Sequence, residues 1–158
     1  MRAGRPLAGR EMANQLQIHL RQKSRSSSEA TIRQHRVPVD RPAAKGGEDT
    51  GPMGGELFLA SIGGCFMSTL LAAIRSREAP ISGVSLKVTG KLADAPARFT
   101  SIELLAAAED GDPETFEKLL DIAERGCIMM NTLRDKLDIT VAVGGFAAAG
   151  SPGFSPEP

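Results

Sequence analysis

Two cysteines are the residues of this chain whose chemistry stands out. Cys65 and Cys127 are the only cysteines among 158 residues, and each lies in a long apolar segment with helical spacing. If the two segments form helices that pack side by side, the fold brings the two thiols together in a mostly apolar interior. A pair of this kind can attack a peroxide with one sulfur and resolve the product with the other. The alternative is two small buried hydrophobic residues, because free cysteine is among the most buried residue types.

The composition sets limits on the class of protein. A length of 158 residues suits one domain. Apolar residues make up 41% of the chain, and 19 acidic residues balance 19 basic ones. This balance argues against a nucleic-acid-binding or membrane-surface protein. The longest apolar stretch, residues 57–73, is interrupted by Gly63, Gly64, Ser68 and Thr69, so we predict no membrane span.

The start of the chain carries no predicted secretory signal. Arg2, Arg5 and Arg10 are present, but no apolar segment of the kind found in signal peptides follows them. We therefore expect a cytoplasmic protein. In a reducing compartment, two free thiols are catalytic, redox-active or buried rather than joined in a permanent disulfide.

The first part of the chain predicts a β-hairpin after a flexible tail over residues 1–14. Apolar and other side chains alternate over residues 16–20, which indicates a strand, while Met12, Leu16 and Leu20 also fit a helical spacing. Residues 24–28 predict a turn, and residues 31–37 resume extended character. Two prolines then limit the second strand to an edge or an end. The glycine-rich stretch 46–52 predicts a loop that leads into the first long helix.

The rest of the chain predicts an alternation of helices and strands. A second helix begins clearly, since Asp112 can cap it and Pro113 suits its first position. The predicted elements are a helix over 55–77, strands over 84–88 and 99–107, a helix from 112 through Cys127, and a strand over 137–143. We predict a disordered tail over 145–158. The order implies an α+β domain with a largely antiparallel sheet and two core helices.

Several short motifs, in this order, resemble the OsmC/Ohr family of osmotically inducible and organic hydroperoxide resistance proteins. They are residues 51–57 followed by Cys65, the upstream residues 40–42 and 46–47, the helix end before Cys127, and residues 131–133. The resemblance covers residues 15–144. It implies an intertwined homodimer in which sheets from both subunits wrap two long central helices.

The resemblance also implies a reaction and its residues. Cys65 would be the peroxidatic cysteine and Cys127 the resolving one, in a site at the dimer interface. The substrate would be an organic hydroperoxide and the reductant a dithiol such as a lipoyl group. We expect no nucleic-acid or membrane partner and no cofactor. An arginine would hold the Cys65 thiolate, and a glutamate would hold that arginine in a charge-assisted pair.

The arginine has two candidates in the first part of the chain. Arg33 and Arg36 are three residues apart on the strand predicted over 31–37, and therefore face opposite sides of it. We favour Arg33, which shares a strand face with His35. The alternative for each is an ordinary surface charge. His19 and His35 lack the local ligand spacing of structural zinc sites, so we predict no metal.

The acid is where the chain departs from the family pattern. Catalytic relatives carry Pro-Glu-Glu or Pro-Glu-Gln before the leucine that opens the first helix, and this chain has Gly55 at the orienting acid and Glu56 at the next position. On a regular helix Glu56 points roughly away from Cys65. Glu56 can hold the arginine only if the start of the helix is irregular. The alternative is that Glu56 is a solvent-facing acid. After Cys127, the usual proline is Ile128.

Three functions are compatible with these residues. The first is a thiol-dependent peroxidase, for which nearby apolar side chains would suit an alkyl hydroperoxide. Those side chains are Phe58, Ile62, Phe66, Met67, Met129 and Met130. The alternative for them is an ordinary place in the hydrophobic core. The second is a non-catalytic OsmC-like protein that binds a small apolar ligand, which the loss of the acid at Gly55 favours. The third is a redox sensor that uses the same two thiols.

Overall fold

The computed structural model describes residues 15–146. The chain forms two compact units, Met1–Gly54 and Gly55–Pro158. The tail predicted over 1–14 lies outside the described residues, as does most of the tail predicted over 145–158. Residues 145 and 146 are an exception, because they complete the last strand of the second unit.

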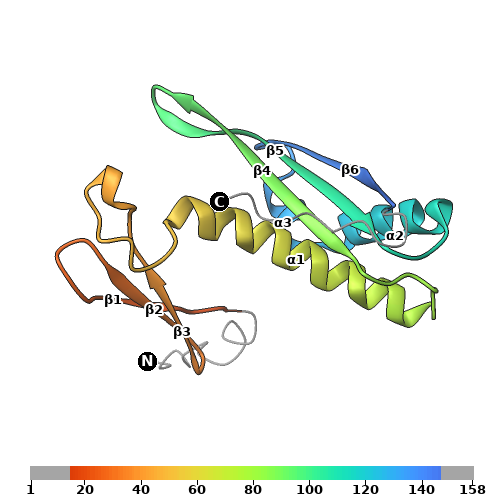
Figure 1. The fold of residues 1–158 in the computed structure, drawn as a ribbon, viewed down its shortest axis with the longest axis horizontal. Helices are drawn as coiled ribbons and strands as arrows, with labels where there is room; N and C mark the ends of the chain where they lie inside the picture. Colours follow the sequence, from red (N-terminus) through yellow and green to blue (C-terminus); the bar gives the residue numbers. More distant parts are fainter. Residues whose placement is uncertain (1–14, 147–158) are drawn as a thin grey trace, which may run out of the picture. The chain divides into compact units, whose positions relative to one another are not determined.

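The first unit contains a three-stranded antiparallel sheet in the order β1-β2-β3 (Figure 1). Its strands are β1 (His19–Gln22), β2 (Ser28–Ile32) and β3 (His35–Val39). The single strand predicted over 31–37 is therefore wrong, since the chain reverses at residues 33 and 34 and Ile32 pairs with His35. Arg33 adopts a positive φ of 55° in this turn. The turn lacks the glycine or asparagine that normally marks such a hairpin, which explains why the sequence did not reveal it.

The sheet of the first unit has one apolar face. Leu20, Ala30 and Val37 are cross-strand partners and so project from the same face. Among residues 15–54, Ala30 is the one buried apolar side chain, whereas Leu20 is 59% exposed. The apolar face of this sheet is therefore buried at Ala30 and exposed at Leu20.

The loop after β3 is organised around the carboxylate of Asp40, which is 3% exposed. It accepts hydrogen bonds from the backbone N–H groups of Arg41, Glu48 and Thr50 at 2.8, 3.1 and 3.2 Å, and from the Thr50 hydroxyl at 2.9 Å. Burial raises the pKa of Asp40, but the hydrogen bonds from Arg41 and Thr50 outweigh it and hold the pKa well below its ordinary value. The loop, which includes the 3-10 turn η2 (Ala43–Lys45), is thereby fixed to the end of β3.

The second unit packs helices against a mixed sheet. Its elements are α1 (Gly54–Ser76), β4 (Ser85–Asp94), β5 (Ala97–Ala108), α2 (Pro113–Gly126), α3 (Ile128–Leu133) and β6 (Asp138–Phe146). The sheet has the order β4-β5-β6, with β4 antiparallel and β6 parallel to β5. Helices α1 and α2 lie on the same side of this sheet (Figure 1). The helices and strands predicted for this part of the chain all occur. The strand predicted over 84–88 is longer than expected and runs to Asp94, and helix α3 was not predicted.

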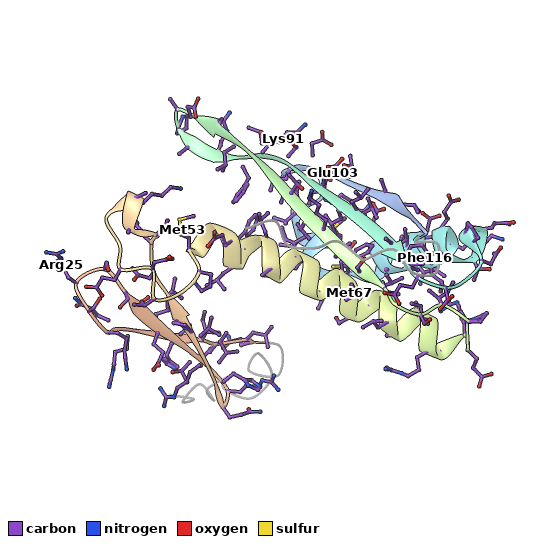
Figure 2. The ribbon with its side chains drawn as sticks, in the orientation of Figure 1. Arg25, Met53, Met67, Lys91, Glu103 and Phe116 are labelled. Carbon is purple, nitrogen blue, oxygen red and sulfur yellow. The ribbon has the colours of Figure 1, made fainter. Side chains whose placement is uncertain are left out.

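The core of the second unit lies between the sheet and the helices. Along β5, buried Ile102 and Leu104 flank exposed Glu103, so one strand face meets the helices and the other faces solvent (Figure 2). The buried residues of the helices are Ile62, Phe66, Leu70 and Ala73 from α1 and Phe116, Leu119, Leu120 and Ala123 from α2. This core fixes α1 and α2 against the same sheet and against each other.

Helix α1 is long and apolar enough to cross a membrane, judged by length and composition alone. The core helix of a globular protein has the same properties. Ile62, Phe66 and Leu70 of α1 are fully buried in the core of the second unit. The structure therefore accounts for the apolar character of one face of this helix by its packing on the sheet.

Helix α2 begins as predicted and ends one residue early. The Asp112 carboxylate caps it by accepting the Thr115 N–H at 2.8 Å, and Pro113 is its first residue. The prediction that Cys127 lies on this helix is wrong. Cys127 has an extended backbone, with φ −80° and ψ 122°, and separates α2 from α3.

Candidate active site

The two cysteine sulfurs lie together in the second unit. The Cys127 thiol donates a hydrogen bond to the Cys65 sulfur, with 3.2 Å between the two Sγ atoms. Both are free thiols. A disulfide bond has an S–S distance of about 2.05 Å, so the sulfurs need to approach by roughly 1 Å when an oxidant converts them to a disulfide. The prediction that the fold brings the two sulfurs within bonding reach is confirmed.

Hydrogen bonds to backbone carbonyl groups hold the chain around each cysteine. Cys65 lies in the middle of α1, and its carbonyl oxygen accepts hydrogen bonds from the Ser68 and Thr69 hydroxyls at 3.0 Å each. Cys127 lies between two helices that Asn131 links. The Asn131 side-chain amide donates to the Arg125 carbonyl at 3.1 Å, and its backbone N–H donates to the Cys127 carbonyl at 3.0 Å. The break in the helix is therefore a fixed bend.

The surroundings of Cys65 favour its thiolate. Burial raises the pKa of this half-buried thiol, but the backbone N–H of Met129, the Cys127 thiol and the backbone N–H of Ile128 lower it, and the lowering prevails. All of these donors come from α3 and the residue before it. The bend at Cys127 thus directs N–H groups toward the Cys65 sulfur.

The surroundings of Cys127 favour its neutral thiol. Its side chain is fully buried, and burial raises its pKa, with a further contribution from the Cys65 sulfur. The Met130 and Met129 N–H groups act in the opposite direction without reversing the shift. One sulfur of the pair is therefore set to ionise first, and the other to keep its proton.

The predicted arginines belong to the first unit, whereas both cysteines belong to the second. Arg33 is exposed in the β2–β3 turn and does not share a strand face with His35, so that part of the prediction is wrong. Arg36 on β3 forms an ion pair with Glu29 at 2.7 Å. The catalytic role of Arg33 stays a prediction. Among residues 15–146, the groups that shift the pKa of Cys65 are backbone N–H groups and a thiol.

Glu56 lies in the first turn of α1, which is helical from Gly54 onward. Nine residues along a helix correspond to about 13 Å, so the structure does not bring the exposed Glu56 beside Cys65. Its predicted pairing with an arginine stays a prediction. A side chain at Gly55 has room, because an added Cβ would lie 3.7 Å from the Phe99 ring, an ordinary contact.

The sequence reasoning missed the residues that support the sulfur pair. They are the N–H groups of Ile128 and Met129, together with Thr69, Gly126 and Asn131. A glycine immediately before Cys127 was a usable signal, because glycine commonly marks the end of a helix. Recognising that end would have placed Cys127 at a bend with N–H groups after it.

No set of three or more potential metal ligands occurs among the described residues, taking histidine, cysteine, aspartate and glutamate together. The site is thus built from two thiols and backbone amides. The arrangement suits thiol chemistry in which one sulfur attacks and the other follows.

Comparison with known proteins identifies the family. Residues 46–142, more than half of the chain, match the family model described as OsmC-like protein. This chain belongs to the OsmC-like family. The resemblance noted from its motifs is confirmed, and so is the predicted OsmC-like α+β fold. No curated protein matches the sequence significantly.

Solved structures of OsmC-like proteins share the fold. An OsmC-like protein from Mycoplasma pneumoniae is similar with a TM-score of 0.74 and 22% identity, over 86% of this chain and 100% of that one. An organic hydroperoxide resistance protein OsmC from Legionella pneumophila has a TM-score of 0.65 and 19% identity, over 80% and 96%. The organic hydroperoxide resistance protein OhrB of Bacillus subtilis has a TM-score of 0.61 and 20% identity, over 82% of this chain and 97% of that one.

Proposed function

We propose that this OsmC-like protein is a thiol-dependent peroxidase that reduces organic hydroperoxides through Cys65 and Cys127. The observation that carries the proposal is the 3.2 Å distance between the two free sulfurs. The names of similar solved proteins, organic hydroperoxide resistance proteins from Legionella pneumophila, Elizabethkingia anophelis and Bacillus subtilis, support the substrate class.

The first step is attack on the peroxide. The Cys65 thiolate attacks the outer oxygen of R–O–OH, an S–O bond forms and the O–O bond breaks. The alkoxide leaves, takes up a proton and becomes an alcohol, and Cys65 becomes a sulfenic acid. This step needs a thiolate, and the lowered pKa of Cys65 supports its assignment as the attacking sulfur.

The second step is resolution by Cys127. Its sulfur attacks the Cys65 sulfenic acid, an S–S bond forms, and the hydroxyl leaves as water with the Cys127 proton. A dithiol such as a lipoyl group then reduces the disulfide by thiol–disulfide exchange and is itself oxidised to a disulfide. Per cycle, one hydroperoxide and one dithiol give one alcohol, one water and one oxidised dithiol.

An arginine and a glutamate complete the proposal. Arg33 is our candidate for holding the Cys65 thiolate, and Glu56 for holding the arginine. Arg33 is exposed at the tip of a hairpin, and so its guanidinium is available for a charge-assisted contact. The test is Arg33→Lys, which keeps the charge and loses the planar fork, beside Arg36→Lys as the matched control.

We also propose a homodimer. In the first unit Leu20, on the apolar sheet face, is 59% exposed. In the second unit Leu71 of α1 and Ile128 of α3 are 46% and 71% exposed. A second copy of the chain would cover apolar surface of this extent, and obligate interfaces are strongly apolar. We expect the protein to work in the cytoplasm, where reduced dithiols are available.

Steady-state turnover tests the function. Wild-type protein should consume cumene hydroperoxide in the presence of dihydrolipoamide, at a rate proportional to enzyme concentration. Cys65→Ser should abolish consumption, because it removes the attacking sulfur. Cys127→Ser should lower dithiol-dependent turnover by at least about tenfold. Equal consumption by wild type and Cys65→Ser would refute the proposal.

One observation favours the runner-up, a protein that binds a small apolar ligand without turnover. An open groove of about 380 Å³ lies between α1 and β4. Its lining is Leu59, Ala60, Gly63, Gly64, Met67, Leu86 and Val88, and neither cysteine is part of it. Saturable binding of an apolar dye at this groove, with no peroxide consumption, would favour the runner-up. A redox sensor would react once with peroxide without sustained turnover.

A further inference from the structure

Gly126, the last residue of α2, lies against Thr69 of α1. A Cβ atom added at Gly126 would be 3.1 Å from the Thr69 Cγ2 methyl. Carbon atoms in ordinary contact are about 3.5–4.0 Å apart, so a side chain here requires either the Thr69 methyl or one of the two helices to move by a few tenths of an ångström. The residue after Gly126 is Cys127, and Thr69 follows Cys65 by one helical turn. The contact is therefore beside the sulfur pair.

Thr69 cannot easily move out of the way. Its hydroxyl donates a hydrogen bond to the Cys65 carbonyl at 3.0 Å. In a helix, a threonine that bonds the carbonyl four residues earlier has its χ1 angle set by that bond, and its methyl is then fixed as well. The methyl of Thr69 thus sets how closely the end of α2 can approach α1 at Cys65.

The local backbone does not itself require glycine at position 126. This residue ends α2 in helical conformation, and alanine has the higher helix propensity. The close approach to Thr69 is what a side chain would disturb. A shift of about 0.5 Å would restore ordinary carbon contact, and it would move Cys127 away from a partner that lies 3.2 Å distant.

We propose that Gly126 and Thr69 are positioning residues for disulfide formation between Cys65 and Cys127. This inference rests on the proposed function. It adds that the contact between these two residues positions the sulfurs for the resolution step. In that step the S–S bond forms, the S–O bond of the sulfenic acid breaks, and water leaves with the Cys127 proton. A sulfur displaced by a fraction of an ångström reacts more slowly, because reactions between fixed groups depend steeply on distance.

The test compares a variant that tightens the contact between Gly126 and Thr69 with a double variant that also removes the Thr69 methyl. Gly126→Ala should form the disulfide at least about tenfold more slowly than wild type, by analogy with other misplaced reacting groups. Thr69→Ser keeps the hydroxyl that bonds the Cys65 carbonyl and removes the methyl. The double variant Gly126→Ala/Thr69→Ser should therefore return to within about threefold of the wild-type rate. Gly54→Ala is the matched control, since an added Cβ there meets nothing within 4 Å.

The use of two oxidants allows this inference and the proposed function to be tested separately. Disulfide formation is followed by non-reducing mass spectrometry with diamide, which accepts the two thiol hydrogens without any peroxide step, and then with cumene hydroperoxide. With hydroperoxide, Gly126→Ala should accumulate the Cys65 sulfenic acid. If wild type fails with hydroperoxide, the proposed function fails, and the diamide series still tests the contact.

Two results would overturn the inference. One is a wild-type rate for Gly126→Ala with diamide. The other is a slow rate that Thr69→Ser does not rescue, because a general loss of stability would not depend on that methyl. Circular dichroism checks folding. If Gly126→Ala alone does not fold, the double variant must fold and form the disulfide, and its failure would contradict the role of the contact.

Discussion

The two cysteines differ in what surrounds each sulfur rather than in their own chemistry. The Cys65 sulfur accepts a hydrogen bond from the Cys127 thiol, and the Met129 and Ile128 N–H groups help to lower its pKa, whereas Cys127 is fully buried. Since the two thiols interact directly, they titrate as a pair. The first proton to leave is assigned to Cys65, and the second leaves less readily than from an isolated thiol.

This difference predicts the pH dependence of thiol alkylation. The pKa of Cys65 is lowered, so its thiolate persists as pH falls below the ordinary cysteine pKa of about 8.5 and disappears only when pH passes through the lowered value. The pKa of Cys127 is raised, so its alkylation should begin above that pH. Peptide mapping after brief iodoacetamide pulses measures both profiles. Identical midpoints for the two cysteines would contradict the assignment.

The missing acid at Gly55 gives a second prediction at this scale. A carboxylate there would add one charge-assisted hydrogen bond to an arginine near Cys65, worth about 1.5–3 kcal/mol, of which half would raise turnover roughly three- to tenfold. The added side chain meets only the Phe99 ring at ordinary distance. Gly55→Glu should therefore raise peroxide turnover, with Gly55→Gln as the uncharged control. An unchanged rate in both variants would show that the site does not depend on an acid at this position.

At the scale of elements, the sequence revealed the helices better than the hairpins. The apolar spacing of α1 and the Asp112-Pro113 start of α2 are local signals, and both helices occur where predicted. The turn at Arg33 carries no glycine, and the pairing of β6 parallel to β5 depends on packing between distant segments. The same difference between local signals and distant packing applies to the site residues. The cysteines could be found from residue type, but the amides that lower the pKa of Cys65 depend on a bend in the chain.

The loop held by Asp40 predicts a local sensitivity to acid. The pKa of this carboxyl is lowered in the folded chain, so the stability it contributes is complete above the unfolded aspartate pKa of about 3.9. That contribution is lost as pH falls from there toward the lowered folded value. Hydrogen exchange of the Glu48 and Thr50 amides, which bond this carboxylate, should accelerate below that pH.

The control for this prediction is Asp40→Asn. It replaces one acceptor oxygen with a donor, so the same two amides should exchange fast at neutral pH and lose their response to acid. Amides of α2, which do not bond Asp40, should be unaffected. Protection in Asp40→Asn equal to that of wild type at neutral pH would contradict the role of the carboxylate.

At the scale of the molecule, we predict that the chain works as a homodimer. Light scattering should give about twice the chain mass of 16.6 kDa at micromolar concentration. Leu20→Glu places a charge on the apolar sheet face and should shift the protein toward monomer, because obligate interfaces are strongly apolar. Arg21→Glu, on the opposite face of the same strand, is the matched control. A wild-type monomer, or equal effects of both changes, would contradict the proposed dimer.

The proposed function requires Cys65 to attack the hydroperoxide and Cys127 to resolve the product. Non-reducing mass spectrometry after one equivalent of cumene hydroperoxide tests it most directly. Wild type should lose two hydrogens with a peptide that joins Cys65 to Cys127, and Cys127→Ser should instead carry one added oxygen on Cys65, trapped as a sulfenic acid by dimedone. A wild-type chain that keeps both thiols, or an added oxygen found on Cys127, would contradict the account.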